Sequence, residues 1–140
     1  MSASKNKYKG TPPRNSKRSE PCTVPESHPD GKYPTLSFRF LQKGWGTEEL
    51  SEKQCQQLLI KWEKRCGMTW TELSQQPKHG LGSEFLPIGK IKPSVPPNFQ
   101  DETKVRVYRH ESNYPMAGFK VGSTFYIVWI EANYNDLYDH

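Results

Sequence analysis

Basic and aromatic side chains recur at strand-like spacing between residues 105 and 140. Arg106 and Tyr108 alternate with valines, which places both on one side of a predicted strand, and Arg109 follows at its end. Such a set suits RNA, because arginine and lysine bind phosphate, tyrosine stacks on bases and histidine exchanges protons near neutral pH. The alternative is that these residues lie on an ordinary solvent-exposed face of the sheet, with their polar ends in water. The candidate catalytic residues are Arg106, Arg109, Lys120, Tyr138 and His140.

Two further basic residues adjoin a glycine-rich turn. Lys78 and His79 precede Gly80 and Gly82, and the backbone amides of such a loop can bind phosphate. The Lys-Ser/Thr pair of a P-loop is absent, and a need for positive φ explains both glycines without a ligand. With tyrosines from the predicted strands added, the candidate RNA-binding residues are Lys78, His79, Tyr108 and Tyr126.

The cysteines and histidines form no recognisable metal site. Cys55 and Cys66 share the predicted face of a helix with Leu58 and Trp62, and neither belongs to the close ligand pair that tetrahedral zinc needs. Both are therefore expected to be buried as small hydrophobic residues. The four histidines lie apart in the sequence, and no G-x-S-x-G motif marks a serine nucleophile. We expect neither a metal nor another cofactor.

The first part of the fold is predicted to consist of one strand and two helices. A period-2 pattern over residues 36–40 predicts a short strand. Ser51 and Gln54 then have the spacing of a capping box, and the helix that they begin is expected to end at Gly67. A second capping box, at Thr69, predicts a short helix to about residue 75.

Four strands are predicted after the helices. Residues 85–88 form a possible strand, and 105–108, 116–121 and 124–131 follow, with a tight hairpin turn at 122–123. The last of these is rich in aromatic and β-branched residues and is the best candidate for a central strand. The fold class is therefore α+β, with two N-terminal helices packed on a twisted antiparallel sheet.

Charge and proline divide the 140-residue chain. Residues 1–32 hold seven basic and three acidic residues, which accounts for most of the net charge of +5. Half of the 12 prolines also fall in the first 34 residues. So few apolar side chains cannot offset the entropy of ordering the backbone. We predict a disordered, proline-rich basic arm over 1–33 and a single α+β domain over 34–140.

The same composition narrows the location of the protein. The longest apolar run, residues 125–130, is far too short to span a membrane, and the basic N-terminus precedes no apolar segment of a secretory signal. Three cysteines are too few for a disulfide framework. We expect a cytoplasmic protein with no membrane partner.

From about residue 50 to residue 140, the order of elements resembles bacterial toxins of the RelE/ParE superfamily. These are small α+β proteins with helices packed on a twisted antiparallel sheet. The segments that carry the resemblance are residues 70–73, Gly80-Leu81-Gly82, 105–109, 118–120, 125–130 and Tyr138-Asp139-His140.

The resemblance implies a metal-independent endoribonuclease that cleaves mRNA at the ribosome and is inhibited by an antitoxin protein. Cleavage in such toxins uses the 2′-hydroxyl of the RNA as nucleophile. Arg106 or Arg109 would then hold the phosphate, and Lys120 would be a second cation. Tyr138 and His140 would act as acid or base, and His79 is an additional candidate base.

Two other functions remain open. One is the gyrase-directed branch of the same superfamily, which is not a nuclease. The other is a non-enzymatic module, such as an accessory protein or a phage-type inhibitor, whose basic arm binds nucleic acid or an acidic protein. The near-neutral charge of residues 33–140 keeps this alternative in view, because phosphate binding by the whole protein would then depend on the arm.

Overall fold

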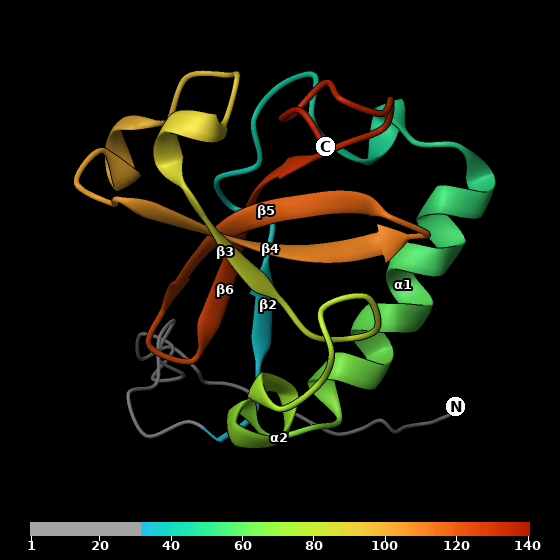
Figure 1. The fold of residues 1–140 in the computed structure, drawn as a ribbon. Coiled ribbons are helices and arrows are strands. Elements are labelled where there is room, and N and C mark those ends of the chain that lie inside the picture. Colours follow the sequence, from blue (N-terminus) through green and yellow to red (C-terminus); the bar gives the residue numbers. More distant parts are fainter. Residues whose placement is uncertain (1–31) are drawn as a thin grey trace, which may run out of the picture.

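A five-stranded sheet organises residues 32–140, the part of the chain that the computed structural model describes (Figure 1). Residues 1–31, almost all of the predicted arm, lie outside this part. The strands are β2 (Thr35–Ser37), β3 (Glu84–Pro87), β4 (Lys104–Glu111), β5 (Tyr114–Val121) and β6 (Thr124–Ile130). The α-helices are α1 (Glu52–Cys66) and α2 (Trp70–Ser74), and the 3-10 helices are η2 (Thr47–Glu49), η3 (Ile88–Lys90) and η4 (Pro97–Phe99).

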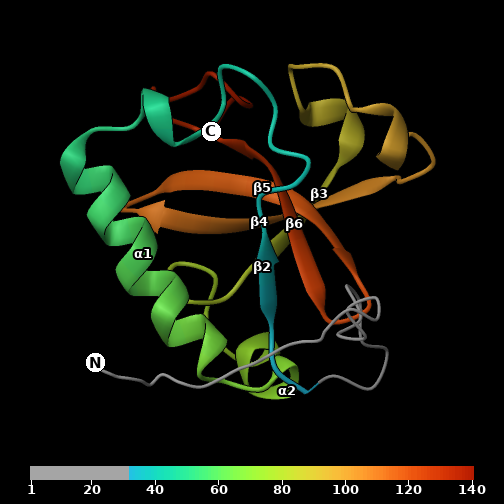
Figure 2. The same ribbon diagram turned by 180° about the vertical axis from the view of Figure 1, so that it is seen from behind.

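The sheet has the strand order β2-β6-β5-β4-β3, and β4, β5 and β6 form the predicted antiparallel meander. Gly122, with φ of +62°, makes the turn between β5 and β6. The expectation of a wholly antiparallel sheet is wrong, because β2 pairs with β6 in parallel, with Leu36 opposite Phe125 (Figure 2). These two strands are far apart in the chain, so no turn between them reveals their relative direction.

Only α1 is a long helix, which corrects the prediction of two helices packed on the sheet. Helix α2 has five residues, although Leu73 on it is buried against the same core as α1. Both predicted capping boxes are confirmed, with reciprocal hydrogen bonds between Ser51 and Gln54 and between Thr69 and Glu72. Gly67 caps α1 with φ of −84°, so this glycine is not used for its access to positive φ.

The face that helix α1 presents to the sheet matches the prediction only in part. Leu58, Trp62 and Arg65 are buried, whereas Leu59 is 66% exposed and Cys66 is exposed. The prediction that the cysteines are core residues is therefore wrong for Cys66. The helix has few apolar residues, so an arginine completes the buried face where an apolar residue would usually lie.

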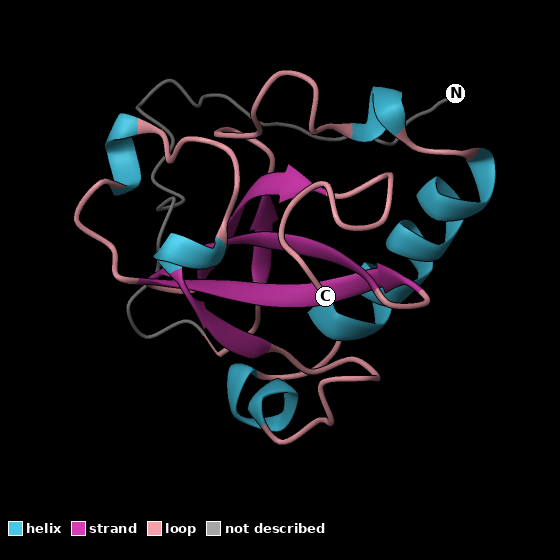
Figure 3. Ribbon diagram, turned by 45° about the horizontal axis from the view of Figure 1, so that its top comes forward, coloured by secondary structure: helices cyan, strands magenta, loops and turns pink. Residues whose placement is uncertain are grey.

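Both faces of the sheet are covered. On one face, α1 and α2 pack against Tyr108, Met116 and Phe125. On the other, β4, β5 and β6 pack against the segments around η3 and η4 and against the end of the chain. Figure 3 shows α1 on one side of the sheet and the short helices η3 and η4 on the other. No helix within residues 32–140 is long and apolar enough to cross a membrane.

A β-bulge lies between β5 and β6. The register shifts between Ala117 and Gly118, and a Cβ atom on Gly118 would collide with the backbone of Tyr126. Only glycine fits at this position without movement of β6.

His110, on β4, is fully buried, and its Nε2 lies 2.8 Å from the backbone oxygen of Glu131. Burial lowers the pKa of this imidazole to about 4. The folded state therefore favours neutral His110, while the unfolded chain binds a proton below pH 6.5.

We predict that stability is lost as the pH falls from 6.5 to about 4, with a contribution from His110 of up to about 1.4 kcal/mol per pH unit. Urea unfolding of the wild type and of His110→Gln across this range measures that contribution. The slope should decrease in H110Q and persist in His79→Gln, which changes an exposed histidine. Equal slopes in wild type and H110Q would show that another group dominates.

Candidate functional site

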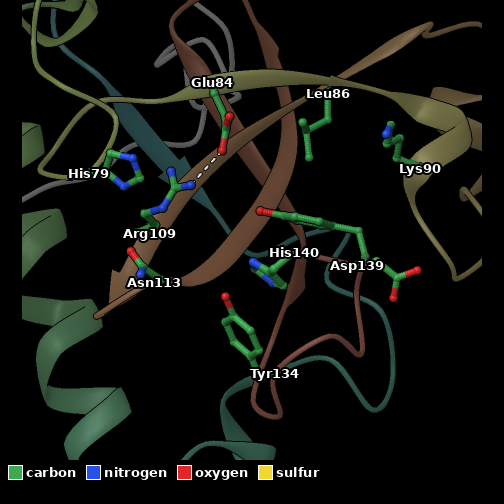
Figure 4. A pocket seen from close by; sticks show the side chains of 10 residues that line it. His79, Glu84, Leu86, Lys90, Arg109, Asn113, Tyr134, Asp139 and His140 are labelled. Atoms are coloured by element: carbon green, nitrogen blue, oxygen red, sulfur yellow. Dashed lines mark hydrogen bonds and ion pairs between the residues drawn. The ribbon is translucent and has the colours of Figure 1, made fainter.

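A pocket of about 320 Å³ lies on the face of the sheet opposite α1 (Figure 4). It is bounded by β3, the end of β4, the loop before β3 and the C-terminal segment of the sequence. The residues that line it are His79, Glu84, Leu86, Lys90, Arg109, Asn113, Tyr134, Tyr138, Asp139 and His140.

An arginine and a carboxylate form one wall of the pocket. Nη2 of Arg109 donates to Oε2 of Glu84 at 2.7 Å, and Nη1 donates to the backbone oxygen of Lys78 at 3.1 Å. The Arg109 side chain is only 7% exposed, and its buried Nε has no hydrogen-bond partner among residues 32–140. Burial by itself would raise the pKa of Glu84, but hydrogen bonds from Arg109 and Lys78 lower it overall. Glu84 is therefore an ionised hydrogen-bond acceptor at neutral pH.

Arg65, on α1, holds the loop before β3 from the opposite face of the sheet. Nε of Arg65 donates to the backbone oxygen of Leu81, and Nη2 donates to that of Arg109, both at 2.8 Å. The guanidinium also lies over the rings of Trp62 and Tyr108. Burial lowers the pKa of Arg65 to about 10, so the group stays charged at neutral pH. One side chain of α1 thus ties the loop to the strand that carries Arg109.

A histidine forms the opposite wall. The imidazole of His140 is stacked between Tyr134 and Tyr138, with ring centroids 4.1 and 4.4 Å away. Its Nε2 lies 3.1 Å from Oε1 of Glu131, and its backbone N–H donates to Oδ1 of Asn135. The imidazole is 12% exposed. These contacts hold the ring in one orientation beside the pocket.

Glu131 is a wholly buried carboxyl group directly after β6. Its Oε2 accepts a hydrogen bond from the backbone N–H of Leu137 at 2.9 Å. Burial raises the pKa of Glu131, although the Leu137 N–H and the neighbouring His140 oppose this rise. When ionised, the carboxylate only accepts hydrogen bonds, so it fixes the proton of His140 on Nε2. Nδ1 is then left to exchange a proton.

Tyr138 contributes a buried hydroxyl that has no hydrogen-bond partner in the described part of the chain. Burial raises the pKa of this phenol to about 12, and Arg109 and Glu84 are near enough to influence it. The group therefore remains protonated at neutral pH and can donate a hydrogen bond to a ligand.

The structure brings together only part of the predicted site. Arg109, Tyr138 and His140 line the pocket with His79, and Lys78 reaches it through a 3.3 Å ion pair with Glu84.

The other predicted residues lie elsewhere. The face of the sheet on which α1 and α2 pack carries Arg106, Tyr108 and Lys120. Side chains alternate along a strand, so the even-numbered Arg106 and Tyr108 of β4 project to the face opposite Arg109. Tyr126 packs against Phe40 and Phe99.

Sequence reasoning missed both carboxyl groups of the site. Glu84 lies at the start of a short strand, where an acidic residue usually faces solvent, and no motif distinguishes it. Glu131 follows a strongly apolar strand, and this position is a signal that could have identified it. A carboxylate next to such a strand is expected to be buried, and a buried charge must be paired.

Within residues 32–140, no group of three histidine, cysteine, aspartate or glutamate side chains is arranged to hold a metal ion. The chemistry that these residues offer is hydrogen bonding, charge stabilisation and proton exchange. The chain matches no protein-family model, and neither curated proteins nor solved structures give a match.

We predict that Arg65→Lys destabilises the protein by roughly 2–4 kcal/mol, because a lysine cannot reproduce the fork that bonds two buried carbonyl oxygens. Urea unfolding measures the change. Lys64→Met, at an exposed position on the same helix, should change stability by less than about 0.5 kcal/mol. An R65K protein as stable as the wild type would show that the two hydrogen bonds of Arg65 do not hold the loop.

Proposed function

We propose that the protein is a metal-independent endoribonuclease that cleaves RNA through the 2′-hydroxyl of the substrate. One observation carries the proposal: the Arg109–Glu84 pair and the oriented imidazole of His140 line the same pocket. Cleavage of this kind needs a base, a cation at the phosphate and an acid, and these three groups can supply them.

Glu84 is proposed as the base and Arg109 as the phosphate-binding cation. Glu84 takes the proton of the 2′-hydroxyl, and the 2′-oxygen then attacks the adjacent phosphorus. The pentacoordinate phosphorane carries extra negative charge, which Arg109 and the hydroxyl of Tyr138 stabilise by donating hydrogen bonds. The buried Nε of Arg109 and the Tyr138 hydroxyl support this role, because neither donor has a hydrogen-bond partner among the residues that the structure describes.

His140 is proposed as the acid. As the bond between phosphorus and the 5′-oxygen breaks, protonated His140 gives its Nδ1 proton to that oxygen. The products are a 2′,3′-cyclic phosphate and a free 5′-hydroxyl. His79, which is exposed at the mouth of the pocket, is a further RNA contact and a second candidate base.

The resemblance to RelE/ParE toxins supplies the finer part of the proposal. It favours mRNA on the ribosome as the substrate, an antitoxin protein as the inhibitor and the cytoplasm as the location. Arg106 and Lys120 are not part of this proposed active site, because they lie on the other face of the sheet.

We predict that Glu84→Gln and His140→Ala each slow RNA cleavage by roughly 100-fold or more. The assay follows a single-stranded RNA in the presence of EDTA and identifies the cyclic phosphate end. Glu48→Gln, at an exposed carboxylate on η2, is the matched control and should cleave at the wild-type rate. In cells, expression of the wild type should arrest growth and expression of H140A should not.

Several results would contradict the proposal. Folded E84Q and H140A proteins that cleave at the wild-type rate would remove the pocket as the active site. Cleavage that EDTA abolishes, or that persists on 2′-O-methyl RNA, would exclude the mechanism. Wild-type protein that binds RNA without cleaving it would favour the non-enzymatic module.

A second prediction concerns Glu131. In Glu131→Gln, the side-chain oxygen can still accept from Leu137, but the amide NH₂ then faces His140 and forces its Nε2 to become an acceptor. The proton then moves to Nδ1 of the neutral imidazole. We predict cleavage that is roughly 10- to 100-fold slower, because the ring no longer has the tautomer that the carboxylate fixes.

The double variant E131Q/H140A separates positioning from a general loss of structure. If Glu131 acts through His140, adding E131Q to H140A should cause little further loss of cleavage rate. Thermal unfolding of each variant establishes that it is folded. Additive losses in the double variant would show that Glu131 does not act by orienting His140.

A further inference from the structure

A second polar surface lies on the other face of the sheet, where α1 and α2 leave β3 and the end of β5 uncovered. We define the basic-aromatic surface as Trp70, Phe85, Lys104, Arg106 and Lys120. A groove of about 80 Å³ crosses it, and Gly118, with no side chain, lies in the groove.

Cations and aromatic rings alternate across this surface. The guanidinium of Arg106 lies 4.6 Å from the ring centroid of Phe85 and 5.7 Å from that of Trp70, and the ammonium of Lys120 lies 4.9 Å from Trp70. Phe85 is 54% exposed, although a large apolar side chain at an edge strand usually costs solubility. An exposed ring held beside an arginine is a platform on which a planar group can stack.

Within residues 32–140, the cations of the surface form no ion pair with a carboxylate. Arg106 donates to Oγ of Ser83 at 3.4 Å, and its Nε has no hydrogen-bond partner in this part of the chain. Burial lowers the pKa of Lys120, and the charge of Arg106 lowers it further, so the two positive groups repel each other. Of the described residues that line the groove, Glu102 is the acidic one. A phosphate between Arg106 and Lys120 would relieve this repulsion.

We propose that the basic-aromatic surface binds single-stranded RNA, with a base stacked on Phe85 and the backbone phosphates on Lys104, Arg106 and Lys120. RNA as the ligand rests on the proposed function, but the binding site is separate from the cleavage pocket. The carboxylates of an acidic peptide would pair with the cations but would not stack on the exposed ring of Phe85. Stacking and charge together favour a nucleic acid.

The position of β3 connects this surface to the pocket. Strand β3 is an edge strand, and its consecutive residues Glu84 and Phe85 project to opposite faces. A single strand of RNA that passes around this edge can therefore reach both sites. A duplex is too stiff for such a path over so short a distance.

The test is binding of a fluorescent 2′-O-methyl RNA of about 12 nucleotides, which fits the usual site size for single strands. This probe has no free 2′-hydroxyl, so binding does not depend on cleavage. Phe85→Leu should weaken binding by about 10-fold through loss of stacking. Phe38→Leu, at another exposed phenylalanine, should bind like the wild type.

The salt dependence tests the cations. For Lys120→Gln, the slope of log K against log salt should fall in magnitude by about 0.7, the value for one phosphate contact on a single strand. Lys43→Gln, at an exposed lysine before β3 in the chain, should leave the slope unchanged.

Three outcomes overturn the inference. Wild-type protein that does not bind the probe excludes the surface as an RNA site, as do F85L and K120Q proteins that bind as tightly as the wild type. Binding of poly-glutamate through these two side chains, without RNA binding, would make the surface a protein interface. Absence of cleavage in the separate activity assay would overturn the ribonuclease proposal while this binding result stands.

Discussion

The buried guanidinium of Arg65 is the constraint on which the candidate site depends. It pairs with no carboxylate among residues 32–140. Two backbone oxygens accept from its Nε and Nη2, and two aromatic rings lie against it, whereas its Nη1 has no hydrogen-bond partner among these residues. A buried charge is tolerated only where such partners are in place, so the loop at Leu81 and the backbone at Arg109 cannot move independently of α1. The fold thereby couples the packing of the helix face to the geometry of a pocket on the opposite face.

Coverage of both sheet faces explains why the pocket is polar. Segments around η3 and η4 exclude water from most of the second face, and the pocket remains where β3 is short and the C-terminal segment turns back. Polar groups that lie there must satisfy one another. Arg109 does so with Glu84, and His140 does so with Glu131. Within residues 32–140, Arg109 Nε and the Tyr138 hydroxyl are the buried donors of this site that have no hydrogen-bond partner.

The sequence predicted local structure well and the assembly of the site only in part. Capping boxes and the hairpin at Gly122 depend on neighbouring residues, and both were confirmed. Leu58 and Trp62 on the buried face of α1 were predicted correctly, but the rest of that face was missed because a charged residue, Arg65, completes it. Arg106 and Arg109 were grouped by proximity, although alternation along β4 separates their side chains. Glu84 was missed because its role comes from Arg109, a residue on the neighbouring strand that local pattern cannot supply.

The balance of positive and negative charge differs between the pocket and the basic-aromatic surface. In the pocket, the charge of Arg109 is balanced by Glu84, and that of His140, when protonated, by Glu131. On the basic-aromatic surface, Glu102 is the acidic residue that lines the groove with Lys104, Arg106 and Lys120 within residues 32–140. If that surface binds RNA as proposed, its positive charge adds to the attraction that the basic residues of 1–32 exert on a polyanion, whereas the nearly neutral pocket would discriminate by hydrogen-bond geometry. The proposed ribonuclease would then divide binding and cleavage between the two faces that meet at β3, which is how a nearly neutral domain could act on a polyanion with few cations.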